Sequence, residues 1–427
     1  MIPVDLVVQN IGQLVNPAGD QAVRGEALNT LRLLEHGVVA AVGERIAFVG
    51  STADFEKTCR TGPETTVVDA EGMVALPGLV DPHTHLPFAG TRQDEFQQKL
   101  LGATYQEIAA RGGGIKRTVR LTREIAAPEL TRVCEQRLDA ILAQGTTLLE
   151  AKSGYGLTLA DELKQLETLA ALSALHPVEL VPTFMGAHEI PEEYAGRPGP
   201  FLEYMAATVA PEVRRQGLAE FADIFCEDGY FSLGEARGYL KAMRELGFSL
   251  KLHADEFTSN GAATLAAEIG ATSAEHLIAA TGEEIATLAA SDTVAVLLPG
   301  VSFFLKLGRY AQAREFIRHG GIVALGTDFN PGSSMVSSQL FVFWLGIFEM
   351  GLTVEQAFHA VTINAAAAIG RAATHGSIVP GKKMDLLLLD IPDYRSLAYH
   401  PGSQPIHTVI KAGEPVIRGR RQQFREE

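Results

Sequence analysis

The chain has 427 residues, of which 46% are hydrophobic and 20% charged, a balance typical of a globular protein with enough length for a large core. Its formal net charge of −15 argues against a sequence-independent nucleic-acid binder, because that function needs a basic surface. Three widely spaced cysteines, the lack of a signal-peptide pattern and the lack of a roughly 18-residue apolar run predict a cytoplasmic protein without a membrane span.

The first part of the chain reads as short strands separated by turns. Apolar runs at residues 5–8, 37–43 and 46–50 are followed or bounded by glycines, which is typical of β-hairpins. After about Met73 the pattern changes, and apolar runs of strand length alternate with longer helix-like segments. This alternation predicts parallel β-α-β construction.

Each strand candidate of this middle region runs into a stretch rich in polar residues and turn formers. The seven candidates are residues 74–80, 146–149, 178–184, 249–252, 271–274, 294–298 and 321–326. An eighth strand is expected around residues 115–121, with helices at 128–144, 160–175 and 353–369. Functional residues at the carboxyl ends of successive parallel strands are what a (β/α)₈ barrel predicts. The competing architecture is a doubly wound open sheet, which would gather them at one crevice.

Strands and turns return near the end of the chain, at residues 381–390 and 405–413. We therefore expect one small β-sandwich domain assembled from both chain ends. The expected division assigns residues 1–75 and 376–427 to this small domain. Residues 76–375 would form a TIM-like (β/α)₈ catalytic barrel of the metal-dependent hydrolase type.

His83 and His85 follow the first of these strand candidates. Side chains two residues apart face the same way on a strand, so both imidazoles can reach one ion. An isolated pair of this kind is weak evidence for a metal. His253 and Asp328 follow later strands, and together the four residues offer three imidazoles and one carboxylate with room for water. That set resembles a catalytic metal site with an open position.

Three further residues at strand ends have more than one interpretation. His188 and His276 are candidates for binding substrate or moving protons. Lys152 is interpreted first as an ion-pairing lysine near a polar rim, and alternatively as a carbamate that bridges two metal ions.

Six sequence blocks resemble those of the imidazolonepropionase family in the amidohydrolase superfamily. They are LPGLVDPHTH at 76–85, FAGTRQDEF at 88–96, KSGYG at 152–156, PTFMGAH at 182–188, KLHADE at 251–256 and TDFNPGS at 327–333. The resemblance covers nearly the whole chain. It implies metal-dependent hydrolytic ring opening of 4-imidazolone-5-propanoate to N-formimidoyl-L-glutamate, a step of histidine degradation. It also implies a homodimer.

The resemblance also implies a role for each matching residue. The metal ligands would be His83, His85, His253 and Asp328, holding one zinc or iron ion per subunit. The substrate would contact Arg92, Tyr155, His188, Glu256 and Ser333, and the opened product would contact Asn330 and Gly332. Proton transfer would fall to Glu256, His276 and Asp328, with the last two acting on water and Glu256 gripping or protonating the ring.

Arg92 has a clear chemical function in such a site. A guanidinium matches a carboxylate in geometry and charge, so it suits the propionate of this substrate. The alternative is an internal ion pair with Asp94 or Glu95. A nucleobase aminohydrolase or another cyclic amidohydrolase is the rival enzyme class, and a nucleobase offers no carboxylate to Arg92. A non-catalytic interaction protein is the rival outside enzymes, although such a protein would be expected to have lost some ligands.

Overall fold

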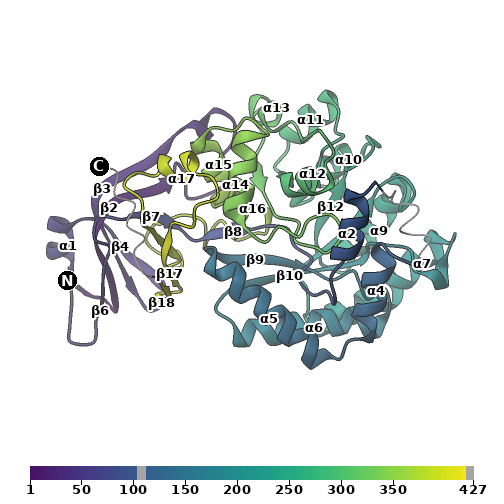
Figure 1. Ribbon diagram of the computed structural model, residues 1–427, viewed down its shortest axis with the longest axis horizontal. Helices are drawn as coiled ribbons and strands as arrows, with labels where there is room; N and C mark the ends of the chain where they lie inside the picture. Colours follow the sequence, from purple (N-terminus) through teal and green to yellow (C-terminus); the bar gives the residue numbers. More distant parts are fainter. Residues whose placement is uncertain (103–111, 420–427) are drawn as a thin grey trace.

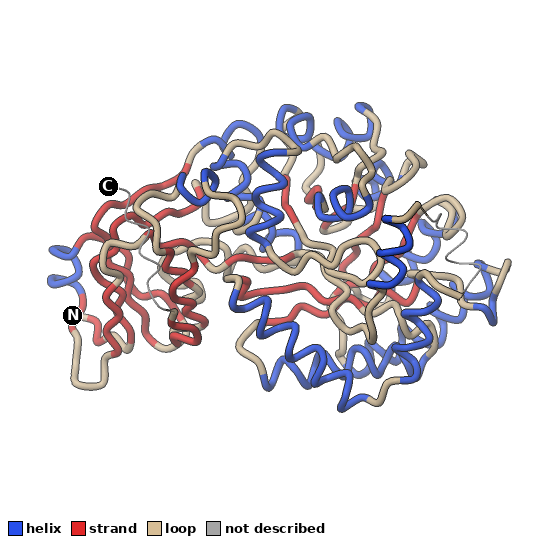
Figure 2. Tube along the Cα trace, viewed as in Figure 1, coloured by secondary structure: helices blue, strands red, loops and turns tan. Residues whose placement is uncertain are grey.

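The computed structural model describes residues 1–102 and 112–419, which form two parts. The first and last strands of the chain lie together in the β-rich part at the left of Figure 1. The middle of the chain forms the larger part at the right, where helices surround strands (Figure 2). In the described ranges, no helix is both long and apolar enough to cross a membrane.

The larger part is a barrel of parallel strands, as the sequence predicts. Its strands, in sheet order, are β8 (Leu79–Asp81), β9 (Thr146–Lys152), β10 (Glu179–Ala187), β11 (Phe221–Cys226), β12 (Ser249–Ala254), β13 (Ser273–His276), β14 (Val294–Leu297) and β15 (Val323–Leu325). A parallel bridge between Thr84 and Phe329 joins the segments that follow the first and last of these strands. The open-sheet alternative is therefore excluded.

The position of one barrel strand is corrected by the structure. Residues 115–121 lie in helix α4 (Ile115–Glu124), where Thr118, Val119 and Thr122 share one buried face at helical spacing. The missing strand is instead β11, whose six residues are all buried. Asp223 interrupts its apolar run, so the hydrophobic pattern alone does not mark this strand.

Two other expected segments are each divided. The segment 353–369 forms α15 (Val354–Ala360) and α16 (Ile363–Ala368), because Thr362 between them has φ −126° and ψ −100°, outside the helical region. The segment 74–80 forms β7 (Val74–Pro77) and β8, separated by Gly78. A Cβ at Gly78 would lie 2.2 Å from Thr147 Oγ1, so only glycine allows this close packing against β9.

Amphipathic helices cover the outside of the barrel. In α5 (Ala127–Ala143), for example, Leu130, Cys134 and Leu138 are buried at four-residue spacing. The other α-helices in the described ranges are α2 (Gln93–Leu100), α6 (Leu159–Leu175), α7 (Pro198–Tyr204), α8 (Ala210–Gln216), α9 (Leu233–Glu245), α10 (Ala262–Glu268), α11 (Gly282–Ala289), α12 (Pro299–Leu305), α13 (Ala313–Arg318), α14 (Gln339–Phe348), α17 (Arg395–Tyr399) and α1 (Thr52–Thr58). Of these, α1 packs on the small β domain and not on the barrel.

The small β domain is built from both chain ends, as expected. Its sheet has the order β18-β17-β16-β7-β2-β3-β4, with β6 beside β2. The strands are β2 (Leu6–Pro17), β3 (Leu31–Val42), β4 (Arg45–Ser51), β6 (Thr66–Asp69), β16 (Leu386–Leu389), β17 (Ile406–Lys411) and β18 (Glu414–Arg418), and β1 (Ile2–Pro3) pairs with β5 (Cys59–Arg60). Pairing of β7 with β16 joins the two ends, and β7 leads directly into the barrel.

Candidate active site

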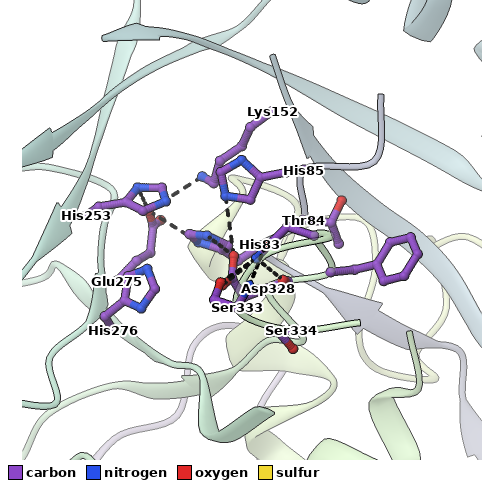
Figure 3. A network of polar contacts seen from close by, with 12 residues as sticks. His83, Thr84, His85, Lys152, His253, Glu275, His276, Asp328, Ser333 and Ser334 are labelled. Atoms are coloured by element: carbon purple, nitrogen blue, oxygen red, sulfur yellow. Dashed lines mark hydrogen bonds and ion pairs between the residues drawn. The ribbon is translucent and has the colours of Figure 1, made fainter. Parts of the chain in front are cut away.

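Five side chains predicted from the sequence converge at the carboxyl end of the barrel. His83 and His85 follow β8, His253 lies in β12, His276 ends β13 and Asp328 follows β15. Figure 3 shows these side chains gathered around one centre. All five are buried, which isolates their interactions from bulk water.

The backbone turns two of these side chains toward the centre. Glu275 faces the barrel interior, so simple alternation along β13 would point the next residue outward. His276 instead has φ +72°, and Asp328 has φ +51°. Such left-handed conformations cost a non-glycine residue about 1–3 kcal/mol and cluster at functional sites.

The distances at this centre are those of a ligand cluster. Asp328 Oδ1 lies 3.2 Å from His83 Nε2 and 3.3 Å from His85 Nε2. The rings of His83 and His253 are 4.6 Å apart between centroids. Ligand atoms of His83, His85 and His253 lie within 4.8 Å of one another, and so do those of His83, His276 and Asp328.

Several buried atoms that face the centre have no hydrogen-bond partner within the described part of the chain. They include Nε2 of His83, Nε2 of His253 and Oδ1 of Asp328. An unpaired buried polar atom costs about 1–3 kcal/mol, so a cluster of them needs a compensating partner. Imidazole nitrogens with one carboxylate are ligands suited to zinc or iron. The residues therefore fit a metal ion.

Burial keeps His85, His188 and His276 neutral. It lowers the pKa of His85 to about 4, although Asp328 opposes the shift. Burial and then the neighbouring His85 lower the pKa of His188 to about 3, and burial also lowers the pKa of His276 well below its usual value. Neutral imidazoles can bind a metal or accept a proton at pH 7.

A fully buried layer of charged residues lies directly beneath the histidines, which we call the charged floor: Glu150, Lys152, Asp223, Lys251 and Glu275. Lys152 Nζ lies 2.7 Å from Glu150 Oε1, 2.8 Å from Asp223 Oδ2 and 3.5 Å from Glu275 Oε2. Lys251 Nζ lies 2.9 Å from Glu275 Oε1 and 3.3 Å from Glu150 Oε1. Lys152 therefore makes ion pairs, although in a buried layer and not at a rim.

These ion pairs fix the protonation of Lys152. Burial alone would lower the pKa of its ammonium, but the charges of Asp223, Glu150 and Glu275 raise that pKa above the usual value. A protonated amine has no lone pair to attack carbon dioxide. The ion-pairing interpretation of Lys152 is thus favoured over the carbamate.

The floor also contacts the histidine rings from below. Asp223 Oδ2 lies 2.9 Å from His253 Nδ1, and Asp223 Oδ1 accepts a hydrogen bond from the His253 backbone N–H at 3.2 Å. Glu275 Oε2 lies 3.4 Å from His83 Nδ1. A carboxylate on Nδ1 leaves Nε2 of the same ring facing the metal centre.

The predicted substrate residues line one cavity of about 560 Å³ above this centre: Arg92, Tyr155, His188, Glu256, Asn330, Gly332 and Ser333. Polar residues from distant parts of the chain are thus brought together in a space suited to a small ligand.

Arg92 is oriented by the loop that follows β15. Its Nε donates to the Pro331 carbonyl at 3.2 Å, and a Cβ at Gly332 would lie 1.6 Å from Nη2. The alternative ion pair with Asp94 or Glu95 is not found, because Arg117 binds those carboxylates at 2.8 and 3.2 Å. The Arg92 guanidinium therefore lines the cavity without a carboxylate partner among the described residues.

The Asn330 amide is used largely within its own loop. Its Nδ2 donates to Asp328 Oδ2 and Ser333 Oγ, both at 2.8 Å, and its Oδ1 accepts from the Gly332 N–H at 2.7 Å. Ser333 Oγ also donates to Asp328 Oδ2 at 3.0 Å. These bonds restrain one oxygen of Asp328 and leave Oδ1 directed at the histidines.

His188 and Tyr155 form one wall of the cavity. His188 Nδ1 bonds the Gly154 carbonyl at 3.1 Å, which fixes Nδ1 as the donor and leaves Nε2 as an acceptor. Its ring stacks on His85 at 4.8 Å between centroids, and Tyr155 lies 5.2 Å from it. Burial raises the pKa of Tyr155, so its hydroxyl stays protonated.

Glu256 lies opposite, with Oε2 at 3.6 Å from His276 Nε2. Burial raises the pKa of Glu256 well above its usual range, and the charges of Asp328 and Glu227 add to the shift. Glu227, the residue directly after β11, accepts hydrogen bonds from the backbone N–H groups of Phe257 and Thr258. It thereby holds the loop that carries Glu256.

Sequence reasoning missed Asp223, Glu227 and Lys99. Asp223 lies in β11 and Glu227 directly follows it. The hydrophobic pattern does not mark this strand, and a charged residue inside an apolar run was the available signal. Lys99, on α2, lines the cavity near Arg92, and burial followed by the Arg92 charge lowers its pKa. Nothing in the local sequence distinguishes Lys99 from a surface lysine.

Comparisons with known proteins agree with this geometry. The model of the amidohydrolase family matches residues 74–416. The imidazolonepropionase of Symbiobacterium thermophilum is 48% identical over 418 residues, covering 98% of each chain. That of Porphyromonas gingivalis is 46% identical over 415 residues, covering 97% of each.

Solved structures share the fold at low sequence identity. A triazine hydrolase variant has a TM-score of 0.73 at 15% identity, covering 99% of this chain and 96% of its own. An adenosine deaminase from Xanthomonas campestris with bound zinc has a TM-score of 0.67 at 20% identity, covering 100% and 95%. The family match and the full-length relatives together decide the assignment: this chain is a hydrolase that belongs to the amidohydrolase family and, within it, to the imidazolonepropionases.

Proposed function

We propose that this chain opens the ring of 4-imidazolone-5-propanoate by hydrolysis, using one metal ion per subunit held by His83, His85, His253 and Asp328. The names of the full-length relatives support the reaction. The observation that carries the metal site is the convergence of buried ligand atoms on these residues, several of which make no hydrogen bond within the described part of the chain. When bound, a zinc or iron ion would supply activated water at neutral pH and polarise a carbonyl.

Arg92 and Lys99 bind the propionate carboxylate in this proposal. Both side chains line the cavity, and neither forms an ion pair with a carboxylate in the described ranges. The Arg92 fork supplies two parallel hydrogen bonds, and the Lys99 ammonium adds a second positive charge. Tyr155 and His188 then position the ring between this cationic end and the metal centre.

The protons are moved by Asp328, His276 and Glu256. Water adds to the lactam carbonyl carbon, and its proton passes to His276, which is neutral and can accept it, or to Asp328. The C–N bond then breaks, the ring nitrogen takes a proton from Glu256, and the proton accepted from water is returned to Glu256, whose Oε2 lies 3.6 Å from His276 Nε2. The raised pKa of Glu256 keeps a proton on its carboxyl for this transfer.

A nucleobase aminohydrolase is disfavoured by the same cavity. Arg92 and Lys99 would face an uncharged ring, which offers no carboxylate to their two positive charges in the cavity. The nucleobase reaction therefore lacks the partner that these side chains require.

We further propose a cytoplasmic homodimer that acts on a small molecule and binds no nucleic acid, in keeping with the acidic charge of −15. For its domains we propose the division 1–75, 76–375 and 376–427. The pairing of strands from both chain ends supports this division, and residues 420–427 lie outside the described residues.

Metal analysis joined to an assay of substrate consumption tests the function. We expect activity to disappear on chelation and to return with zinc or iron at one equivalent per subunit. The His83→Ala variant should lose metal and activity together, because it lacks a central ligand. Full turnover by metal-free protein would overturn the proposal.

A further inference from the structure

The charged floor contains a second set of metal-ligating groups. Ligand atoms of Asp223, His253 and Glu275 lie within 4.8 Å of one another, and all three residues are buried. This set shares His253 with the proposed metal site and lies on the floor side of that ring, where Asp223 Oδ2 is 2.9 Å from Nδ1.

A cation already lies against this set. The Lys152 ammonium is 2.8 Å from Asp223 Oδ2 and 3.5 Å from Glu275 Oε2, and Lys251 is 2.9 Å from the other oxygen of Glu275. Figure 3 shows Lys152 beside His253 and Glu275. The floor's three carboxylates, including that of Glu150, therefore face two ammonium groups.

We propose that the Lys152 side chain takes the place of a second metal ion and so limits each subunit to one metal. The proposal rests on the one-metal site described above. The Lys152 ammonium supplies a positive charge at the carboxylates that a second ion would otherwise bind. Lys152 is thus a positioning residue that sets metal stoichiometry, and it does not touch the substrate.

Charge balance gives the expected effect of removing this side chain. With Lys152, the floor carries three negative and two positive charges; without it, a second negative charge is left uncompensated in a buried layer. Such a charge is strongly destabilising unless it is paired. Truncation to alanine also vacates the space of the ammonium and its stem. A divalent cation bound by the carboxylates of Asp223 and Glu275 would restore the compensation.

Zinc stoichiometry is the test, because it does not depend on turnover. Apo wild-type protein and Lys152→Ala would be titrated with zinc by calorimetry, and bound zinc would be measured by mass spectrometry after gel filtration. We expect one zinc per wild-type subunit and two per Lys152→Ala subunit. The double variant Lys152→Ala/Asp223→Asn, which removes one charge of each sign, should return to one.

Each failure has a distinct meaning. A wild-type subunit that binds no metal contradicts the proposed function, whereas a wild-type subunit that binds two, or a folded Lys152→Ala that binds one, overturns the inference. If Lys152→Ala unfolds without metal, recovery of its thermal transition only beyond the first equivalent of zinc supports the inference. If Lys152→Ala does not fold at all, the number of zinc ions bound per subunit is measured for Lys152→Gln, because glutamine keeps much of the volume without the charge. Two zinc ions would support the inference and one would overturn it.

Discussion

Replacement of Arg92 by lysine isolates the geometric part of carboxylate binding. Lysine keeps the positive charge but loses the fork and the Nε–H that donates to the Pro331 carbonyl at 3.2 Å. Loss of one charge-assisted hydrogen bond costs about 1.5–3 kcal/mol. Since 1.36 kcal/mol corresponds to a factor of ten, we expect KM to rise about 10- to 100-fold, with kcat changed much less.

Steady-state kinetics with 4-imidazolone-5-propanoate would measure this split. Arg132→Lys is the matched control, because Arg132 makes the same kind of bidentate pair with Glu129 on the exposed surface of α5. Its KM should stay at the wild-type value. An unchanged KM in Arg92→Lys would refute the carboxylate role. If kcat fell about 10- to 100-fold while KM stayed unchanged, Arg92 would instead make an interaction that forms only in the transition state.

Three further changes have defined outcomes. Gly332→Ala places a Cβ 1.6 Å from Arg92 Nη2 and should raise KM at least tenfold while leaving the melting temperature nearly unchanged; a normal KM would contradict the cavity geometry. Glu256→Gln should lower kcat about 10²- to 10⁴-fold with normal metal content, and a kcat within threefold of wild type would remove it from proton transfer. Burial alone would raise the pKa of Glu179, but His375 and Lys411 lower it to about 2, so this carboxylate stabilises the fold above pH 4.5. Because Glu179 is one-third exposed, Glu179→Gln should cost only about 1–2 kcal/mol in denaturant unfolding at pH 7, and the difference should vanish as the pH falls from 4.5 toward 2.

Local hydrophobic patterns in the sequence predict most of the fold and the positions of the candidate metal ligands. The histidines at 83, 85 and 253 stand at the ends of apolar runs, and period-two alternation directs such residues to one face. The (β/α)₈ barrel follows from the same runs and is confirmed. The individual role of each site residue stays a prediction, because a role depends on a bound substrate and metal.

The charged floor could not be predicted in the same way. Lys152, Asp223 and Glu275 come from three strands, and only the assembled barrel brings the two carboxylates within 3.5 Å of the Lys152 ammonium. A hydrophobic pattern treats a buried charge as an interruption of a strand, so it does not mark β11, and the eighth strand is expected instead at residues 115–121, which lie in α4. The eighth strand is misplaced because ion pairs with distant residues allow Asp223 to be buried, and the local sequence does not show those partners.

Pairing of β7 with β16 has a consequence for biosynthesis. Leu76 lies opposite Leu387 in the strand register, roughly 300 residues earlier in the chain. At about 5–20 residues per second, a ribosome would need about 15–60 s to deliver the partner. During that time β7 would present an open sheet edge, which is a template for wrong pairing with other chains. Nascent-chain chaperones would therefore be most needed before the last strands emerge, and slower elongation in this interval should lower the yield of native protein.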